Sequence, residues 1–409
     1  MKNIYTILVA ILLAQSTLAQ RIKTDQVAAH ISYLSSDRLQ GRGTSSEGER
    51  LAAAYITSQF KAMGLSPKGS KGYYYDFTFR HSKKVHDTTH ADGEIRKGRN
   101  VLAYLDNNAE YTIVIGAHFD HLGLGHDENS LDANPHGRIH NGADDNASGV
   151  AGVLELARYF AHNGIREKYN FLFMTFSGEE LGLLGSKKWC ENPSYPLERI
   201  NYMVNMDMIG RLNDSTHKLL VHGVGTSAEW IPALEKINTH FVMKYDSAGI
   251  GPSDQTSFYL KNIPVVHFFT GQHSDYHKPT DDFDKINLKG EADILELIID
   301  MIFELEQKPK LNFLKTKEPE SKRMSFGVTL GVMPDYTFDG KGMRLDGVSD
   351  GKPASKAGLQ GGDIITALGS HTIQSVQDYM KALAQFKKGE RTIIEFIRAN
   401  SKMALEVEF

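Results

Sequence analysis

The chain has 409 residues, enough for one large domain and a smaller one. Hydrophobic residues make up 41% of the sequence, which is ordinary for a soluble protein and sufficient for a sizeable core. The 46 basic and 50 acidic residues leave a formal charge of −4. This balance offers no basic face and excludes nucleic acid as an expected partner.

The N-terminus has the pattern of a signal peptide. Lys2 precedes an apolar run over residues 4–14, and the segment closes with Ala19. The run is shorter than the roughly 20 apolar residues that span a bilayer, although a retained anchor is the alternative. We expect residues 1–19 to be removed and the protein to be secreted or periplasmic, with no stable membrane insertion. The one cysteine, Cys190, lies too far downstream to carry a lipid at the cleavage site, and it has no partner for an intrachain disulfide.

Strand and helix patterns alternate along the chain after this segment. Helices are predicted at residues 25–34, 46–63, 148–162, 227–240 and 290–307. Strands are predicted at residues 73–79, 101–105, 111–117, 169–176, 202–208, 218–223 and 264–269. A long polar loop is expected at 123–140. The alternation predicts an α/β fold, with a mostly parallel mixed sheet sandwiched by helices.

The pattern changes after residue 310. Residues 311–323 are rich in Lys and Glu and contain a Pro, which is typical of a linker. Residues 324–409 contain several short strands and one helix, at 375–385, and predict a small α+β domain. The large domain is therefore expected to occupy residues 20–310.

Five short segments offer metal-binding side chains in the order His, Asp, Glu, Asp, His. The segments are Ala117-His118-Phe119-Asp120, Gly142-Ala143-Asp144-Asp145-Asn146, Ser177-Gly178-Glu179-Glu180-Leu181, Asn205-Met206-Asp207-Met208 and Asp275-Tyr276-His277. Imidazole and carboxylate together suit zinc-like divalent ions. Five ligands exceed the four of one tetrahedral ion, so two ions that share a carboxylate are the simplest interpretation.

The first segment ends an apolar strand. Because strand side chains alternate with period two, Asp120 is expected to point the same way as His118 and to accept the second ring N–H of that imidazole. His121 is expected to lie on the opposite side, as a loop or core histidine.

Some of the remaining segments also have interpretations that require no metal ion. Asp144 and Asp145 stand just before a helix, so either could bind metal, and both could equally belong to an N-cap cluster. Glu179 and Glu180 follow a buried strand, and adjacent carboxylates diverge, so that one can bind a cation while the other moves a proton. Asp207 is expected on a buried strand, where an unpaired carboxylate would be costly and a cation is the simplest partner. His277 alone would be a surface histidine more often than a ligand.

Together these segments resemble peptidase family M28, the zinc aminopeptidases. The residues that carry the resemblance are 117–120, 142–149 (GADDNASG), 177–186 (SGEELGLLGS), 205–210 and 276–277, with 36–67 as an N-terminal helical stretch. The similarity covers roughly residues 25–307. It implies a zinc-exopeptidase fold and hydrolysis of N-terminal residues from peptides.

The resemblance also implies roles for individual residues. Asp145 would bridge two zinc ions, or other divalent metals in their place. His118 and Asp207 would complete one ion, and Glu180 and His277 the other. Glu179 matches the general base, and Tyr276 matches a position that stabilises the oxyanion in some members.

Residues 324–409 resemble a bacterial PDZ domain. Phe326-Gly327-Val328 matches the carboxylate-binding loop, and residues 347–365 match the pattern that follows it. Such a module binds an extended peptide by strand addition and captures its C-terminal carboxylate. The alternative is a domain that only packs against the peptidase.

Two other functions remain open from the sequence. A glutaminyl cyclase shares the fold but usually uses one zinc ion, and the five-ligand set argues against it. The other is a peptide-binding protein that acts mainly through its PDZ domain, and the presence of Glu179 argues against that.

Overall fold

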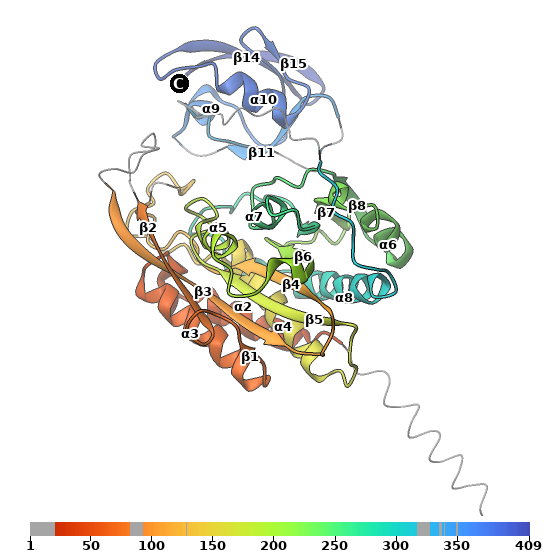
Figure 1. The fold of residues 1–409 in the computed structure, drawn as a ribbon. Helices are drawn as coiled ribbons and strands as arrows, with labels where there is room; N and C mark the ends of the chain where they lie inside the picture. Colours follow the sequence, from red (N-terminus) through yellow and green to blue (C-terminus); the bar gives the residue numbers. More distant parts are fainter. Residues whose placement is uncertain are drawn as a thin grey trace, which may run out of the picture.

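The protein is described by a computed structural model over residues 21–81, 93–127, 129–316, 328–334, 338, 340–348 and 351–409 (Figure 1). The expected signal peptide, residues 1–19, lies outside these ranges. So do residues 317–323 of the expected linker, and Phe326 and Gly327 of the expected carboxylate-binding loop. Within the described ranges, none of the helices combines the length and the apolar character needed to cross a membrane.

A mixed sheet forms the centre of the first part of the chain. In the described residues it has nine strands in the order β1-β3-β5-β4-β6-β9-β7-β8, with β2 paired to β3. The pairs β5–β4, β4–β6, β6–β9 and β7–β8 are parallel, and the other pairs are antiparallel. The strands are β1 (Ser66–Pro67), β2 (Tyr74–His81), β3 (Glu94–Leu105), β4 (Tyr111–His118), β5 (Tyr169–Phe176), β6 (Ile200–Met206), β7 (Lys218–His222), β8 (Val242–Asp246) and β9 (Val265–Phe269).

Strand β5 shows why the sheet is buried on both faces. All eight of its residues are buried, and their side chains alternate between two hydrophobic cores. Phe171 and Phe173 belong to one core, and Leu172, Met174 and Phe176 belong to the other. A strand that is apolar on both faces requires helices on both sides of the sheet.

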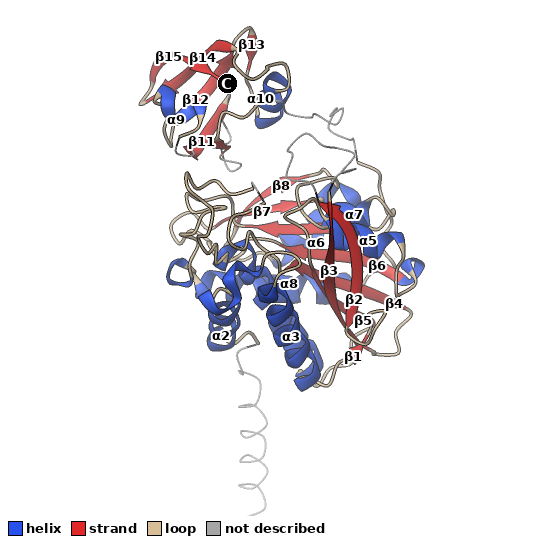
Figure 2. Ribbon diagram, turned by 90° about the vertical axis from the view of Figure 1, so that its left-hand side faces the viewer, coloured by secondary structure: helices blue, strands red, loops and turns tan. Residues whose placement is uncertain are grey.

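Helices supply these two layers, as Figure 2 shows. The larger layer contains α2 (Thr24–Leu34), α3 (Glu47–Ala62), α4 (Gly149–His162), α6 (Trp230–Ile237) and α8 (Leu288–Leu305). The other face is covered by α5 (Leu184–Glu191) and α7 (Gln255–Tyr259). Helix α3 begins where the Ser46 side chain accepts a hydrogen bond from the Glu49 N–H, at 3.1 Å. Short 3₁₀ turns occur at Asp37–Arg42, Leu197–Arg199, Val224–Thr226 and Phe283–Lys285, and a π-type turn occurs at Ala143–Ser148.

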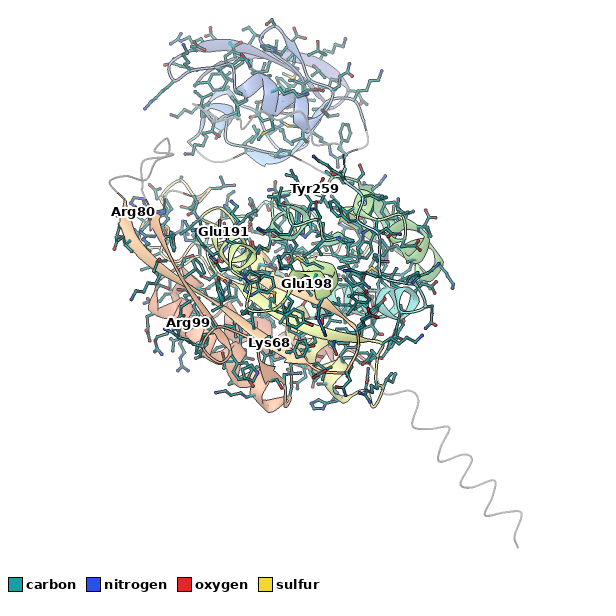
Figure 3. All side chains as sticks on the ribbon, in the orientation of Figure 1. Lys68, Arg80, Arg99, Glu191, Glu198 and Tyr259 are labelled. Carbon is teal, nitrogen blue, oxygen red and sulfur yellow. The ribbon has the colours of Figure 1, made fainter. Side chains whose placement is uncertain are left out.

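The C-terminal part has its own sheet and core. In the described residues, its antiparallel sheet has the order β10-β11-β12-β14-β15, with β13 paired to β12. Its elements are β10 (Val332–Pro334), β11 (Met343–Val348), α9 (Pro353–Ala357), β12 (Ile364–Leu368), β13 (His371–Thr372), α10 (Val376–Leu383), β14 (Arg391–Arg398) and β15 (Ser401–Glu408). Where the chain leaves the first part, the hydroxyl of Tyr259, labelled in Figure 3, accepts a hydrogen bond from the Thr316 N–H at 3.1 Å.

The predicted fold class is confirmed for both parts of the chain. The mixed sheet between helix layers matches the expected α/β fold, and the antiparallel sheet with two helices matches the expected α+β domain. The strand predicted at residues 169–176 has the same bounds in the structure. Edge strand β8 and helices α5 and α7 were not predicted, because they are short and their apolar residues do not form a long periodic pattern.

Candidate metal centre and active site

Four neighbouring strands bring most of the candidate site residues to one edge of the sheet. Strands β5, β4, β6 and β9 are adjacent and parallel, so their carboxyl ends meet there. His118 is the last residue of β4, and Asp207 follows the last residue of β6. Glu180 comes just after β5, and His277 lies in the loop after β9. Asp145 belongs to the turn that leads into α4.

The carboxylate of Asp145 lies between two groups of side chains. Its Oδ1 is 3.3 Å from Nε2 of His118, and that nitrogen is 3.2 Å from Oδ1 of Asp207. Its Oδ2 is 3.3 Å from Nε2 of His277, and that nitrogen is 3.0 Å from Oε2 of Glu180. The structure therefore brings all five predicted ligands together, with Asp145 shared by both groups.

These separations fit the coordination of zinc-like ions. Two ligands that are each about 2.0–2.1 Å from a tetrahedral zinc ion lie about 3.3 Å apart, which matches the distances within each group. The donor set of imidazole nitrogens and carboxylate oxygens is also the one that zinc accepts. Asp145, His118 and Asp207 could thus hold one ion, and Asp145, Glu180 and His277 could hold a second.

Both predicted histidine ligands present the same ring nitrogen. Nδ1 of His118 lies 3.1 Å from the main-chain carbonyl of Asp120, and Nδ1 of His277 lies 2.9 Å from the carbonyl of Asn129. Each Nδ1–H donates to a carbonyl, because a carbonyl can only accept. Nε2 of each ring then carries the free lone pair that a metal ion needs.

The expected role of Asp120 is corrected by the structure. Its carboxylate was expected to accept the ring N–H of His118, but the nearest carboxylate oxygen is 3.8 Å from Nδ1, and the carbonyl accepts instead. The Asp120 carboxylate accepts hydrogen bonds from Oγ1 of Thr44 at 2.9 Å and from the Glu179 N–H at 3.1 Å. The reason is that β4 ends at His118, so the two-residue alternation does not extend to Asp120. Asp120 thus contacts the site by holding the main chain of Glu179.

The predicted catalytic residues Glu179 and Tyr276 both line the cavity beside these ligands. Burial raises the pKa of Glu179 well above its ordinary value, and the carboxylates of Glu180 and Asp207 add to the rise while His118 opposes it. Burial also raises the pKa of Tyr276, which keeps its hydroxyl protonated and able to donate. The Tyr276 ring stacks on His277, with 3.9 Å between ring centroids.

The position of His121 differs from the prediction. The residue was expected on the opposite side from His118, away from the site, but its Nδ1 is 2.7 Å from Oε1 of Glu180 and 3.8 Å from Oδ2 of Asp145. Its imidazole is buried. The error has the same cause as the one at Asp120, since both residues lie beyond the end of β4, where alternation no longer predicts direction.

A cavity of about 500 Å³ opens beside the two ligand groups. Its wall includes residues that sequence patterns did not single out, mainly from β7, β8, β9 and the loop after β8: His222, Asp246, Ser247, Ile250, Pro252, His267, Phe269 and Gln272. These residues belong to no sequence motif, so their place at this site could be predicted only from the order of the strands in the sheet. The cavity places polar and apolar surface next to the candidate metal ligands, as a small-molecule or peptide site requires.

Comparison with known proteins agrees with this geometry. The profile of peptidase family M28 matches residues 100–302, and that of the PDZ domain matches residues 327–409. An aminopeptidase of Bacillus subtilis is 28% identical over 187 residues, covering 41% of this chain and 39% of the relative. The chain spans about two fifths of the length of the first curated relatives that it matches.

Solved structures share the fold of the first part. The LapA aminopeptidase of Legionella pneumophila superimposes with a TM-score of 0.53 at 20% identity, covering 70% of this chain and 72% of that one. A glutaminyl cyclase of Porphyromonas gingivalis superimposes with a TM-score of 0.56 at 18% identity, covering 70% of this chain and 99% of that one. At identities this low the likeness shows the fold alone. By the profile matches, residues 100–302 belong to peptidase family M28, and a PDZ domain follows them at residues 327–409.

Proposed function

We propose that this protein is an exported metallo-aminopeptidase with two zinc ions, which removes N-terminal residues from peptides. The observation that carries the proposal is the position of Asp145, whose two oxygens each face a separate imidazole and carboxylate pair. A shared carboxylate between two ligand groups is the arrangement that two-metal hydrolases use. We assign His118 and Asp207 to one ion and Glu180 and His277 to the other.

The residues around the cavity have separate roles in the proposed reaction. When bound, a pair of zinc ions would lower the pKa of a water and polarise the scissile carbonyl. Glu179 accepts the proton of the attacking water and later delivers it to the leaving amine. Burial raises the pKa of Glu179, which favours the protonated form that delivers the proton to the amine. The Tyr276 hydroxyl donates a hydrogen bond to the oxyanion that forms on the substrate.

We assign residues 1–19 to a signal peptide, 20–310 to the peptidase domain, 311–323 to a linker and 324–409 to the PDZ domain. Export would place the enzyme outside the cytoplasm, in the periplasm or the medium. Peptides are the substrates, and the PDZ domain takes the C-terminal end of a peptide as its ligand.

A panel of aminoacyl anilides, assayed with and without a chelator, tests the activity. We expect hydrolysis that the chelator abolishes and zinc restores. Glu179→Gln should reduce kcat by roughly 10²- to 10⁴-fold with no change in folding or metal content, because it removes the base and keeps the side-chain shape. No hydrolysis of any substrate by the zinc-loaded protein would contradict the proposal and favour a peptide-binding role for the PDZ domain.

The likeness to a glutaminyl cyclase gives the second candidate function. A peptide with N-terminal glutamine distinguishes the two, since a cyclase releases ammonia from it while an aminopeptidase releases free glutamine. Metal content gives an independent answer. Two zinc ions per chain would support the aminopeptidase, and one would support the cyclase.

A further inference from the structure

His121 contacts the proposed metal site but is not one of the five residues assigned to it. Its Nδ1 lies 2.7 Å from Oε1 of Glu180, and its ring meets the ring of His277 edge-on, with 5.9 Å between centroids. The side chain is fully buried. A polar ring in this place has a specific partner, the ligand carboxylate of Glu180.

The two oxygens of Glu180 have different neighbours. Oε2 faces Nε2 of His277 at 3.0 Å, on the side of the proposed ion, and Oε1 faces His121. The last torsion of a glutamate side chain is soft, so the carboxylate can turn unless something holds it. A donor on Oε1 fixes which oxygen points at the ion.

The proton of His121 can be placed from this contact. An unprotonated Nδ1 would set its lone pair against a carboxylate oxygen at 2.7 Å, which is repulsive, so Nδ1 carries hydrogen and donates to Oε1. Nε2 has no hydrogen-bond partner among the residues that the structure describes. A buried nitrogen without a hydrogen bond costs free energy, so an apolar side chain would fill this space better if packing were the only role of His121.

The surrounding chain holds the imidazole in place. The His121 N–H donates to the carbonyl of Arg42 at 3.3 Å, and the residue forms an isolated bridge with Gly43. Gly142 leaves the space that the ring occupies, since a Cβ there would lie 2.5 Å from Cδ2 of His121. The backbone of His121 is thus anchored, and its ring packs directly against Gly142.

We propose that His121 is a positioning residue, which holds Glu180 through an Nδ1–H···Oε1 hydrogen bond and so directs Oε2 at the ion shared with Asp145 and His277. This rests on the proposed two-zinc site. Direct binding of the metal by His121 fits the geometry less well. Two ligands of one tetrahedral zinc ion are about 3.3 Å apart, whereas 2.7 Å is a hydrogen-bond distance.

Two substitutions separate these roles. His121→Asn keeps an N–H donor at the place of Nδ1 but cannot replace an imidazole as a zinc ligand, and His121→Leu removes the donor. His121→Gln serves in place of the leucine variant if that variant does not fold, because its amide lies farther from Cβ and misses Oε1. His30→Leu is the control, since His30 is a buried histidine on α2 whose Nδ1 lies 2.8 Å from the Tyr55 hydroxyl, outside the site.

Zinc content and zinc retention against a graded chelator are measured on the full chain, with circular dichroism to confirm folding. We expect two zinc ions in the wild type and in His30→Leu. His121→Leu should release one of the two ions at a roughly 10- to 100-fold lower chelator concentration, and His121→Asn should stay close to the wild type.

The outcomes that overturn the inference differ from those that overturn the proposed function. If His121→Leu retains zinc as well as the wild type does, His121 only packs against the site and does not position Glu180. Equal loss in the asparagine and leucine variants would make it a direct ligand instead. A wild type that binds one zinc ion or none would overturn both the two-zinc proposal and the role of His121.

Discussion

Arg42 donates a hydrogen bond from Nη2 to the carbonyl oxygen of Gly142, 3.0 Å away, and so joins residues that are 100 positions apart. Nε of the same guanidinium donates to the carbonyl of Phe119 at 2.8 Å, and Nη1 donates to Asn141 at 2.7 Å and to Leu34. The side chain is fully buried, and burial lowers its pKa to about 10, so it is still charged at neutral pH. One cation thus ties the N-terminal helical segment to both loops that carry His121 and Asp145.

Replacing Arg42 with methionine should destabilise the protein strongly. The substitution leaves several buried carbonyls without a donor, and we expect a loss of about 3–5 kcal/mol in the free energy of unfolding. Denaturant titration of the two proteins measures it. Arg38→Met, at an exposed position four residues earlier, is the matched control and should change stability by less than about 0.5 kcal/mol. Equal effects of the two substitutions would contradict the role of Arg42.

Removing one ligand from each group should remove one ion and spare the other. We expect Asp207→Asn to lose the ion near His118, and Glu180→Gln to lose the ion near His277, because the carboxylate supplies the charge in each group. Elemental analysis should find close to one zinc ion per chain in each variant. Asp25→Asn, at an exposed position on α2, should keep both. Loss of both ions from a single ligand substitution would show that the two pockets are not independent.

Gly142→Ala should be costly for two separate reasons. Gly142 has a φ of +57°, which strains any other residue, and its new Cβ would collide with the carbonyl of Asp145 and the ring of His121. Gly164 also has a positive φ, of +74°, but has open space around the same position. Gly164→Ala therefore measures the backbone strain alone, about 1–2 kcal/mol. The Gly142 variant should lose about 1–3 kcal/mol more in thermal or denaturant unfolding and bind zinc more weakly.

His30 should make the protein less stable in mild acid. Burial, together with the charge of Arg158, lowers the pKa of His30 from 6.5 to about 4 in the folded protein. Between about pH 4 and pH 6.5, His30 is therefore protonated in the unfolded chain and neutral in the folded protein. The stability from neutral His30 is complete above about pH 6.5 and is lost as the pH falls to about 4, by up to about 3 kcal/mol.

Unfolding measured across this pH range for the wild type and His30→Gln tests the effect. The wild type should lose more stability than the variant between pH 7 and pH 4, and the difference isolates His30 from the carboxylates that titrate in the same range. Parallel pH profiles for the two proteins would show that folding does not shift the pKa of His30.

Sequence patterns predicted best what depends on long buried runs. Residues 169–176 formed a recognisable strand because most of their side chains are apolar and all eight residues are buried. Strand β8 carries polar and partly exposed residues at the edge of the sheet, so it has no such pattern. The five predicted ligands could be singled out because each belongs to a short motif. The directions of Asp120 and His121 were wrong because they depend on where β4 ends, which tertiary contacts decide.

The cavity wall could not be predicted for a related reason. His222 and Asp246 stand on β7 and β8, and the order of these strands in the sheet follows from crossovers that no local pattern encodes. Their place beside the candidate metal ligands emerges only when β9 is seen to lie between β6 and β7.

The alignment of the ligands with adjacent strand ends also determines when metal can bind during folding. Segments that stand far apart along the polypeptide become neighbours only after β5, β4, β6 and β9 have paired. A cation has no complete set of donors to gather until that pairing exists. A metal ion that binds there would therefore meet a sheet that is already assembled, and it would stabilise the folded domain instead of directing its folding.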